Sequence, residues 1–302
     1  MAEPKTDDPD DEESDDERPE DDVEMGFFEH LRELRTRLVR AVFGILPFMA
    51  LAWYFRLEVF AWISIPYRRG HTAPENLDTA TLWHWLTTPI PADLNAEAIP
   101  PDEMLTATGP MDMFVVYMVM SAIVGLIIAS PWVFWQLYGF IAPGLYRREK
   151  RYVLPFITSA SVLFLSGVYF GYSLVLPLAY QFFLSLNEEA HVHELTTIDK
   201  YLPLTAKLLL AFGVTFQVPV VVTLLSFAGI VNWKQLVKFG RWWLVLSTII
   251  GAILTPPDPV SQLMMAVPLN ILYWIAVPLA YLFGPKPSDT PPGGLTEDGY
   301  ER

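Results

Sequence analysis

Long uncharged stretches dominate the pattern of apolar and polar positions along this chain. Residues 113–146, 152–187 and 208–233 contain no Asp, Glu, Lys or Arg over 34, 36 and 26 positions. Each stretch exceeds the roughly 20 residues with which a helix crosses about 30 Å of hydrocarbon. There are three further apolar segments. Residues 38–65 are interrupted by charged side chains, residues 242–254 form a short segment, and residues 261–283 form one of ordinary length. The pattern predicts an all-α integral membrane protein with six transmembrane helices.

The expected organisation is one six-span unit between two tails. We place this unit at residues 26–284, with spans at about 38–63, 112–136, 152–183, 201–228, 241–255 and 261–283. Residues 1–25 and 285–302 are the tails. Prolines recur inside the spans, and each removes a backbone donor and crowds the preceding turn. These prolines are Pro131, Pro155, Pro177, Pro219, Pro268 and Pro278. The helices are therefore expected to be kinked and the bundle concave.

The fifth apolar stretch, residues 242–254, is short. Its 13 residues would rise about 20 Å as a helix, before a proline-rich turn. Such a helix would thin the bilayer locally, draw on flanking residues or be shielded by partners. An ordinary short helix packed against its neighbours explains the length as well.

The formal net charge of -14 belongs mainly to one end of the chain. Residues 1–24 hold 14 acidic side chains against Lys5 and Arg18, a local net charge of -12. A run with so few apolar residues is expected to be a solvated, disordered tail. Hydrophobic residues make up 52% of the whole chain, which fits an integral membrane protein.

Basic residues alternate between the connections of the predicted spans. They cluster before the first span, after the second and after the fourth: Arg32, Arg35, Arg37, Arg40; Arg147, Arg148, Lys150, Arg151; Lys234, Lys238, Arg241. The opposite connections hold only Arg68, Arg69 and Lys200. The positive-inside rule therefore predicts that both termini are cytoplasmic, in a multi-pass protein of the cell membrane.

The sequence offers little for catalysis. The chain has no cysteine, its five histidines all lie outside the predicted spans, and no span carries Asp or Glu near its middle. An intramembrane enzyme would need a nucleophile, a base or a metal at that depth. We therefore expect no enzyme activity, no cofactor and no metal site.

Two glutamates lie in arginine-rich stretches that both face the predicted cytoplasmic side. Glu33 is in HLRELRTRL (30–38), and Glu149 is in PGLYRREKR (143–151). A carboxylate at such a position is a candidate receptor for a cationic ligand. Glu33 also has Arg37 four residues away, so an ion pair within one helix explains it equally well. The residues alone leave both interpretations open.

Gln217 is the most notable polar residue inside a predicted span. It lies in FGVTFQVP (212–219), near the middle of the fourth span. An amide in hydrocarbon needs hydrogen-bond partners, and such bonds between helices contribute about 0.6 to 2 kcal/mol. An internal contact between helices and a site for a partner helix are both consistent with this position.

Five segments in register make the chain resemble TatC, the polytopic core subunit of the twin-arginine protein translocase. They are HLRELRTRL (30–38), SIPY (64–67), FWQLYGFIAPGLYRREKR (134–151), FGVTFQVP (212–219) and LTPPDPVSQ (254–262). The resemblance covers roughly residues 27–283. It implies a receptor and scaffold that binds twin-arginine signal peptides of folded proteins at the cytoplasmic face. It also implies recruitment of single-span TatA- and TatB-type subunits, self-association, and export driven by the proton motive force.

The resemblance also assigns roles to residues. Signal-peptide binding falls to Glu33 and Glu149, assisted by Arg35, Phe140, Pro143 and Tyr146. Two carboxylates can each form paired hydrogen bonds with one guanidinium, which lysine reproduces poorly. Contact with partner subunits falls to Gln217, Thr255 and Gln262, and structural roles to Pro66, Pro256, Pro257 and Asp258. The fourth-span position is often Glu in this family, so Gln217 cannot supply the charge that a carboxylate would.

The main alternative is a secondary transporter or channel for a small solute. It predicts ionisable groups near the membrane midplane, and the spans lack them. Membrane lipid is the remaining expected partner, and no nucleic acid is expected.

Overall fold

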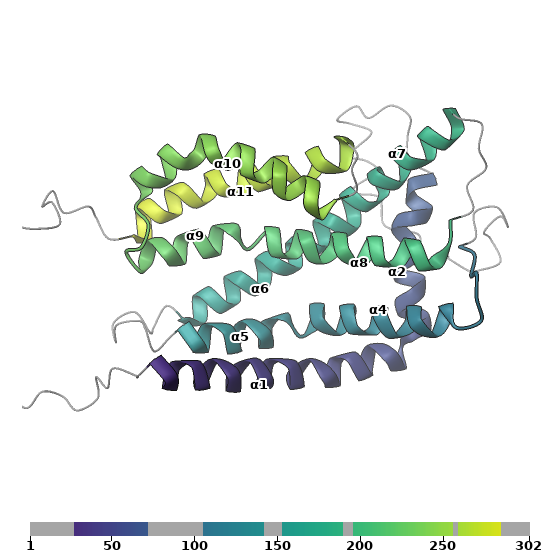
Figure 1. Cartoon of the computed structure of the whole chain (residues 1–302), viewed down its shortest axis with the longest axis horizontal. Helices are drawn as coiled ribbons and strands as arrows, with labels where there is room; N and C mark the ends of the chain where they lie inside the picture. The colour runs from purple at the N-terminus through teal and green to yellow at the C-terminus, as the bar shows by residue number, and fades with distance from the viewer. Residues whose placement is uncertain (1–26, 72–104, 142–152, 190–195, 256–258, 285–302) are drawn as a thin grey trace, which may run out of the picture.

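The structure is a computed structural model that describes residues 27–71, 105–141, 153–189, 196–255 and 259–284 (Figure 1). These residues are helical except for short connections, and a single bridge between Thr106 and Thr197 is their only β-pairing. The helices are α1 (Phe27–Tyr54), α2 (Arg56–His71), α4 (Asp112–Ile128), α5 (Ser130–Ile141), α6 (Val153–Phe170), a π-helical segment (Gly171–Val175), α7 (Leu176–Glu189), α8 (Ile198–Thr215), α9 (Val218–Phe227), α10 (Trp233–Leu254) and α11 (Pro259–Phe283). The all-α prediction is confirmed.

Six membrane spans can be formed from the helices of the described residues. Five continuous segments are long and apolar enough to cross a membrane: Leu31–Tyr54, Leu154–Leu186, Ile198–Phe227, Trp233–Leu254 and Ser261–Leu282. The sixth is the pair Asp112–Ile128 and Ser130–Phe140, which is bent by 58°. The break falls at Ala129, just before Pro131, as expected for a residue that cannot continue the preceding hydrogen-bond ladder. Kinked helices are thus confirmed at this point.

The first helix begins and ends earlier than predicted. α1 ends at Tyr54, and after Phe55 the chain turns into α2, which runs across the ends of the other helices (Figure 1). The predicted span at 38–63 is therefore wrong at its end, because apolar content alone does not reveal the turn at Phe55. Helix α2 also continues through Pro66 to His71, beyond the predicted end of the first span.

The prediction that the fifth helix is short is wrong. α10 has 22 residues, since it begins at Trp233 rather than near Trp242. Asn232 forms a capping box: its side chain accepts from the N–H of Lys234, and Gln235 accepts from the N–H of Asn232. The basic residues Lys234, Lys238 and Arg241 are thus part of the helix, so charge along its first turns hid its true length.

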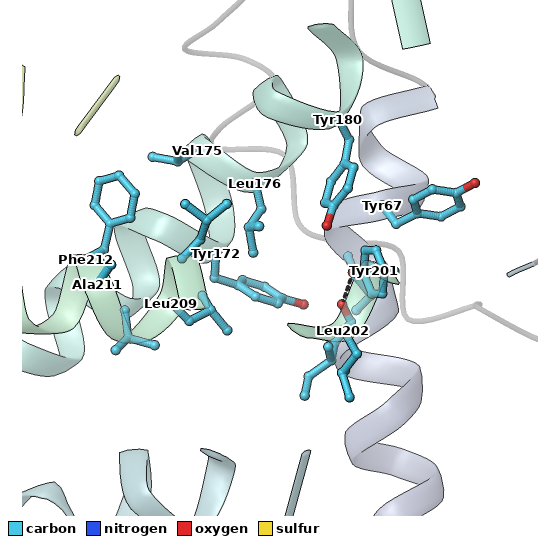
Figure 2. Packing of buried hydrophobic residues seen from close by; sticks show 14 of the residues in the cluster. Tyr67, Tyr172, Val175, Leu176, Tyr180, Tyr201, Leu202, Leu209, Ala211 and Phe212 are labelled. Carbon is cyan, nitrogen blue, oxygen red and sulfur yellow. Dashed lines mark hydrogen bonds between the residues drawn. The ribbon is translucent and has the colours of Figure 1, made fainter. Parts of the chain in front are cut away.

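A buried cluster joins the helices where α2 meets the bundle. Tyr172, Leu176, Tyr201, Leu208 and Phe212 are each at most 2% exposed. Figure 2 shows Tyr172 of the π-helical segment and Tyr201 of α8 directed toward α2, with Phe212 farther from α2 along α8. The rings of Tyr67 and Tyr201 meet edge to face, with centroids 5.4 Å apart. Since Ile63, Ile65 and Tyr67 of α2 are buried in the same cluster, this cluster fixes its position.

The first helix begins and the last helix ends on the same side of the bundle. Figure 1 shows the start of α1 and the end of α11 at the left, together with the end of α5, the start of α6 and the turn from α9 to α10. The exposed basic residues Arg32, Arg35, Lys234 and Lys238 lie on helices at this end. We call it the basic end. That it faces the cytoplasm stays a prediction.

Candidate functional site

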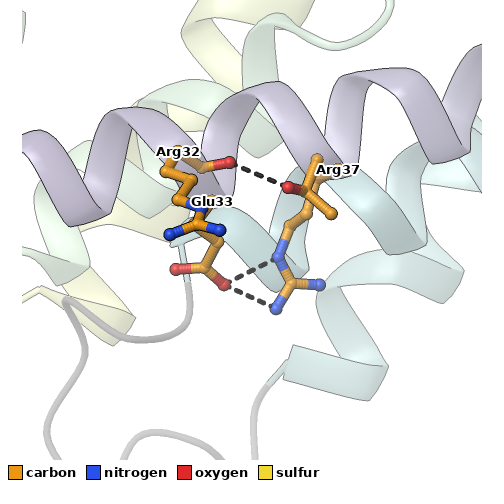
Figure 3. Close-up of polar contacts among 4 residues, drawn as sticks. Arg32, Glu33 and Arg37 are labelled. Carbon is orange, nitrogen blue, oxygen red and sulfur yellow. Dashed lines mark hydrogen bonds and ion pairs between the residues drawn. The ribbon is translucent and has the colours of Figure 1, made fainter.

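Glu33 forms an ion pair within α1 near the basic end. Arg37 lies one turn further along α1, and its Nε and Nη2 atoms donate to Glu33 Oε1 at 2.9 and 2.8 Å. Figure 3 shows both donors directed at the same carboxylate oxygen. The side chains of Arg37 and Glu33 are 27% and 20% exposed. The intrahelical pair that the spacing predicted is therefore present.

The other oxygen of Glu33 has no such partner. Oε2 is buried and forms no hydrogen bond with any residue in the part of the chain that the structure describes. Leaving a buried acceptor unsatisfied costs about 1 to 3 kcal/mol, and more for a charged group. The geometry therefore leaves one carboxylate oxygen of Glu33 in need of a donor.

Helix α5 holds the guanidinium of Arg37 in place. A Cβ at Gly139 would meet the guanidinium carbon of Arg37 at 2.9 Å, so only glycine lets the side chain lie this close to the α5 backbone. Sequence reasoning missed Gly139. An isolated glycine in an otherwise apolar helical segment was the available signal, since it often marks a close approach.

Two more contacts along the same seam keep α1 and α5 together. The indole Nε1 of Trp132 donates to the carbonyl of Arg40 at 3.2 Å. The same indole lies against Gly44, where a Cβ would overlap it. The position of the Glu33–Arg37 pair is thus set by packing of α1 on α5 and not by α1 alone.

The other residues predicted for this site are only partly placed. Arg35 is exposed on α1, and Phe140 is half-buried in the last turn of α5, at the same basic end. Glu149, Pro143 and Tyr146 lie outside the described residues. The fold therefore brings Glu33, Arg35 and Phe140 to one end of the molecule, while the second glutamate stays a prediction.

The residues predicted to contact partner subunits each have a bond within the chain. Gln217 Nε2 donates to the carbonyl of Ala160 in α6 at 3.0 Å. Thr255 donates to the Gly251 carbonyl at 2.8 Å, and Gln262 Nε2 donates to the Thr248 carbonyl at 3.2 Å. Gln217 thus joins α6 to the start of α9, whereas the other two residues belong to the α10–α11 pair.

Of the predicted structural residues, Pro66 lies buried within α2. Pro256, Pro257 and Asp258 fall outside the described residues. Among the residues that the structure does describe, no group of three or more His, Cys, Asp or Glu side chains could hold a metal ion.

These features define a polytopic helical membrane protein with a charged site at one end and no grouping of residues for metal chemistry in the described part. Residues 29–268 match the sequence profile of the family described as "Sec-independent protein translocase protein (TatC)". The chain belongs to this TatC family, which is a family of protein-transport components and not of enzymes.

Two individual relatives and one solved structure support the same family assignment. The chain is 35% identical to the Sec-independent protein translocase protein TatC of Azotobacter chroococcum mcd 1 over 260 residues, which are 86% of this chain and 91% of that one. It is 32% identical to the TatC of Aquifex aeolicus over 259 residues, or 85% and 95% of the two chains. A crystal structure described as the twin-arginine translocase receptor TatC superposes with a TM-score of 0.65 at 32% identity, covering 84% of this chain and 99% of that chain.

Proposed function

We propose that this chain is the receptor and scaffold of a twin-arginine translocase, and that it binds signal peptides through Glu33 and Glu149. The observation that carries the proposal is the buried Oε2 of Glu33, which has no donor among the described residues although Oε1 has two from Arg37. A guanidinium from a signal peptide would supply that donor. Membership of the TatC family supports the same assignment.

Chemistry favours arginine over lysine at such a site. A guanidinium offers parallel N–H donors that match a carboxylate, whereas an ammonium is a compact, strongly hydrated charge. Arg37 already uses one oxygen of Glu33, so the incoming arginine either binds Oε2 beside it or displaces it. Two adjacent arginines would require a second carboxylate, and Glu149 is the one that we assign to this role.

We also propose a membrane orientation and partner subunits for the chain. The basic end would face the cytoplasm of the cell, with both termini inside, because Lys and Arg are favoured there. TatA- and TatB-type single-span subunits would pack near Gln217, Thr255 and Gln262, further copies of the chain would join the assembly, and the proton motive force would drive export.

Photo-crosslinking of a signal peptide to the full chain tests the receptor assignment. We expect a peptide with Arg-Arg to crosslink and one with Lys-Lys to crosslink much less. Glu33→Gln and Glu149→Gln, which keep the shape but remove the charge, should each weaken binding of the Arg-Arg peptide about tenfold or more, because a charge-assisted hydrogen bond contributes about 1.5 to 3 kcal/mol.

Glu58→Gln is the matched control. Glu58 is exposed in the first turn of α2, away from the basic end, so its replacement should leave crosslinking unchanged. Equal crosslinking of the Arg-Arg and Lys-Lys peptides would contradict the receptor assignment. Full binding by Glu33→Gln would remove Glu33 from it.

A further inference from the structure

An apolar cavity of about 290 Å³ lies between α6, α9 and α11. Its lining comes from three helices that are distant in sequence: Pro155, Phe156, Ser159, Leu163, Pro219, Val220, Thr223, Phe227 and Leu279. None of these residues belongs to the Glu33 site or to the residues assigned to partner subunits. The cavity therefore needs an explanation of its own.

The two polar side chains in the lining do not require a polar ligand. The hydroxyl of Ser159 donates to the Phe156 carbonyl at 3.0 Å, and that of Thr223 donates to the Pro219 carbonyl at 2.6 Å. Both bonds stay within one helix. The remaining lining is hydrocarbon, so the cavity is suited to an apolar occupant.

One wall is made rigid by stacked aromatic rings. The ring of Phe156 stacks on that of Tyr138, with centroids 6.3 Å apart, and meets the ring of Phe227 at 6.1 Å with an angle of 69°. Two prolines, Pro155 and Pro219, lie in the first turns of their helices. The wall is thus built from side chains with little rotational freedom, and the cavity is preformed.

The dimensions favour a single flexible chain. From Pro155 to Leu163 along α6 the lining rises about 12 Å. The volume corresponds to about ten small groups, if each takes the roughly 30 Å³ of a water in the liquid. A helix, about 10 to 12 Å across, could place only its side chains in this space. A hydrocarbon chain of about ten methylene groups matches it.

The cavity continues the lipid-facing surface of the same helices. Leu154 and Val162 on α6 are each 61% exposed, and Val221 on α9 is 49% exposed. In a membrane these apolar side chains meet lipid, and an acyl chain from that lipid layer can enter the cavity without leaving hydrocarbon.

Charge at the basic end indicates which lipid. Phe227, which lines the cavity, ends α9, and α10 follows after a short turn with exposed Lys234, Lys238 and Arg241. Their spacing of four and three residues places them on one face of α10. Basic residues at a membrane surface attract anionic lipids by about 1 kcal/mol each. A headgroup at this end would be held near them.

We propose that the α6–α9–α11 cavity binds one acyl chain of an anionic phospholipid, whose headgroup lies at the basic end of the bundle. This site is separate from the signal-peptide site and goes beyond the receptor function. It would make a specific lipid part of the folded protein, bridging α6 to the α9–α11 pair.

The test uses the full chain in nanodiscs that contain phosphatidylglycerol with a diazirine on one acyl chain. After illumination, mass spectrometry locates the labelled residues. We expect adducts to concentrate on residues 155–163 and 219–227. Ser159→Phe, which fills the cavity, should reduce these adducts several-fold, and the smaller Ser159→Leu should reduce them too.

Ser166→Phe is the matched control. Ser166 is on the same helix, and its hydroxyl also donates three residues back, to the Leu163 carbonyl at 2.8 Å, but it is exposed. This variant should keep the adducts. Unlabelled phosphatidylglycerol should compete better than phosphatidylcholine, and equal competition would overturn the anionic assignment.

Two other results would overturn the site itself: adducts spread evenly over all lipid-facing helices, or adducts unchanged by both Ser159 variants. Loss of the adducts when a single-span subunit is added would assign the cavity to a partner helix instead. Signal-peptide crosslinking, measured on the same variants, should be unaffected, so failure of this proposal is distinguishable from failure of the receptor assignment.

Discussion

Tyr172 supplies the hydrogen-bond donor that Pro66 withholds from Trp62. The carbonyl of Trp62 lies four residues before Pro66 in α2, and proline has no N–H with which to complete the helical bond. The hydroxyl of Tyr172 donates to this carbonyl at 2.6 Å, and the two rings stack with centroids 4.2 Å apart. Next to it, Tyr201 donates to the carbonyl of Ile63 at 2.5 Å. A proline inside α2 is thus tolerated because a core side chain donates to the carbonyl that the proline leaves without a partner.

We expect Tyr172→Phe to loosen α2 without unfolding the bundle. The ring stays in place, but the Trp62 carbonyl loses its donor, which costs about 1 to 3 kcal/mol. Hydrogen exchange should speed up for the amides of α2, and the apparent Tm should fall. Tyr169→Phe is the control, because Tyr169 lies three residues before Tyr172 in the same continuous span and is 65% exposed. If both variants behave alike, the hydroxyl of Tyr172 does not anchor α2.

Two glycine substitutions should separate site geometry from stability. At Gly139 an added Cβ meets the end of the flexible Arg37 side chain, which can move aside. At Gly125 it would meet the backbone of Met49, at 2.7 Å from both Cα and N. Gly139→Ala should therefore leave the apparent Tm almost unchanged, while Gly125→Ala should destabilise by about 1 to 3 kcal/mol through overpacking.

The effects of the same two substitutions on signal-peptide binding should be the reverse of their effects on stability. Gly139→Ala displaces Arg37 from α5 and so changes the donors at Glu33 Oε1. Signal-peptide crosslinking, compared at equal amounts of folded protein, should change for Gly139→Ala and not for Gly125→Ala. Unchanged crosslinking with Gly139→Ala would show that the Arg37–Gly139 contact does not tune the site.

Lys207 should stabilise the end of α10. Its Nζ donates to the carbonyl of Ile253 at 3.2 Å. This carbonyl lies in the last turn of α10, and the residue four positions on is Pro257, which has no N–H to offer. A cation at a helix C-terminus contributes about 0.3 to 1 kcal/mol. Lys207→Met should speed hydrogen exchange at residues 251–255, while Lys207→Arg should not. Lys200→Met, an exposed lysine of the same helix, controls for loss of charge.

The sequence was sufficient to predict the number of spans and the intrahelical pair of Glu33, because both follow from local spacing. It did not reveal the turn at Phe55, since residues 51–55 are apolar and turn residues such as Gly or Pro are absent there. The length of α10 was hidden for the opposite reason, because Lys234, Lys238 and Arg241 interrupt the apolar pattern without interrupting the helix.

Contacts between distant segments were beyond sequence reasoning. Gly139 could be recognised as an isolated glycine, but its neighbour, Arg37, lies 102 positions earlier and meets it only because α1 packs on α5. Likewise, nothing local indicates that Tyr172 compensates for Pro66. Such pairs depend on tertiary packing, which single-sequence patterns of period 3.6 do not encode.

The bond from Gln217 to the Ala160 carbonyl shows that Gln217 makes an internal contact, so any contact with a partner subunit must be made in addition to it. The amide joins the break between α8 and α9 to the middle of α6. One N–H of its Nε2 is therefore used within the chain, which leaves the other N–H and the Oε1 atom for any partner. Replacement by Glu would keep an acceptor but remove the donor whenever the carboxyl is ionised.

We therefore expect Gln217→Leu and Gln217→Glu to lower the stability of the isolated chain by about 0.6 to 2 kcal/mol, the range for hydrogen bonds between membrane helices. Thermal unfolding in detergent measures this loss, with Val214→Leu, at an exposed position one turn earlier, as control. Co-purification of a single-span subunit separates the two roles. Loss of stability with full recovery of the subunit would mean that Gln217 serves internal packing alone. If Gln217→Glu recovers the subunit and Gln217→Leu does not, the side-chain oxygen is the partner contact, because glutamate has that oxygen and leucine lacks it.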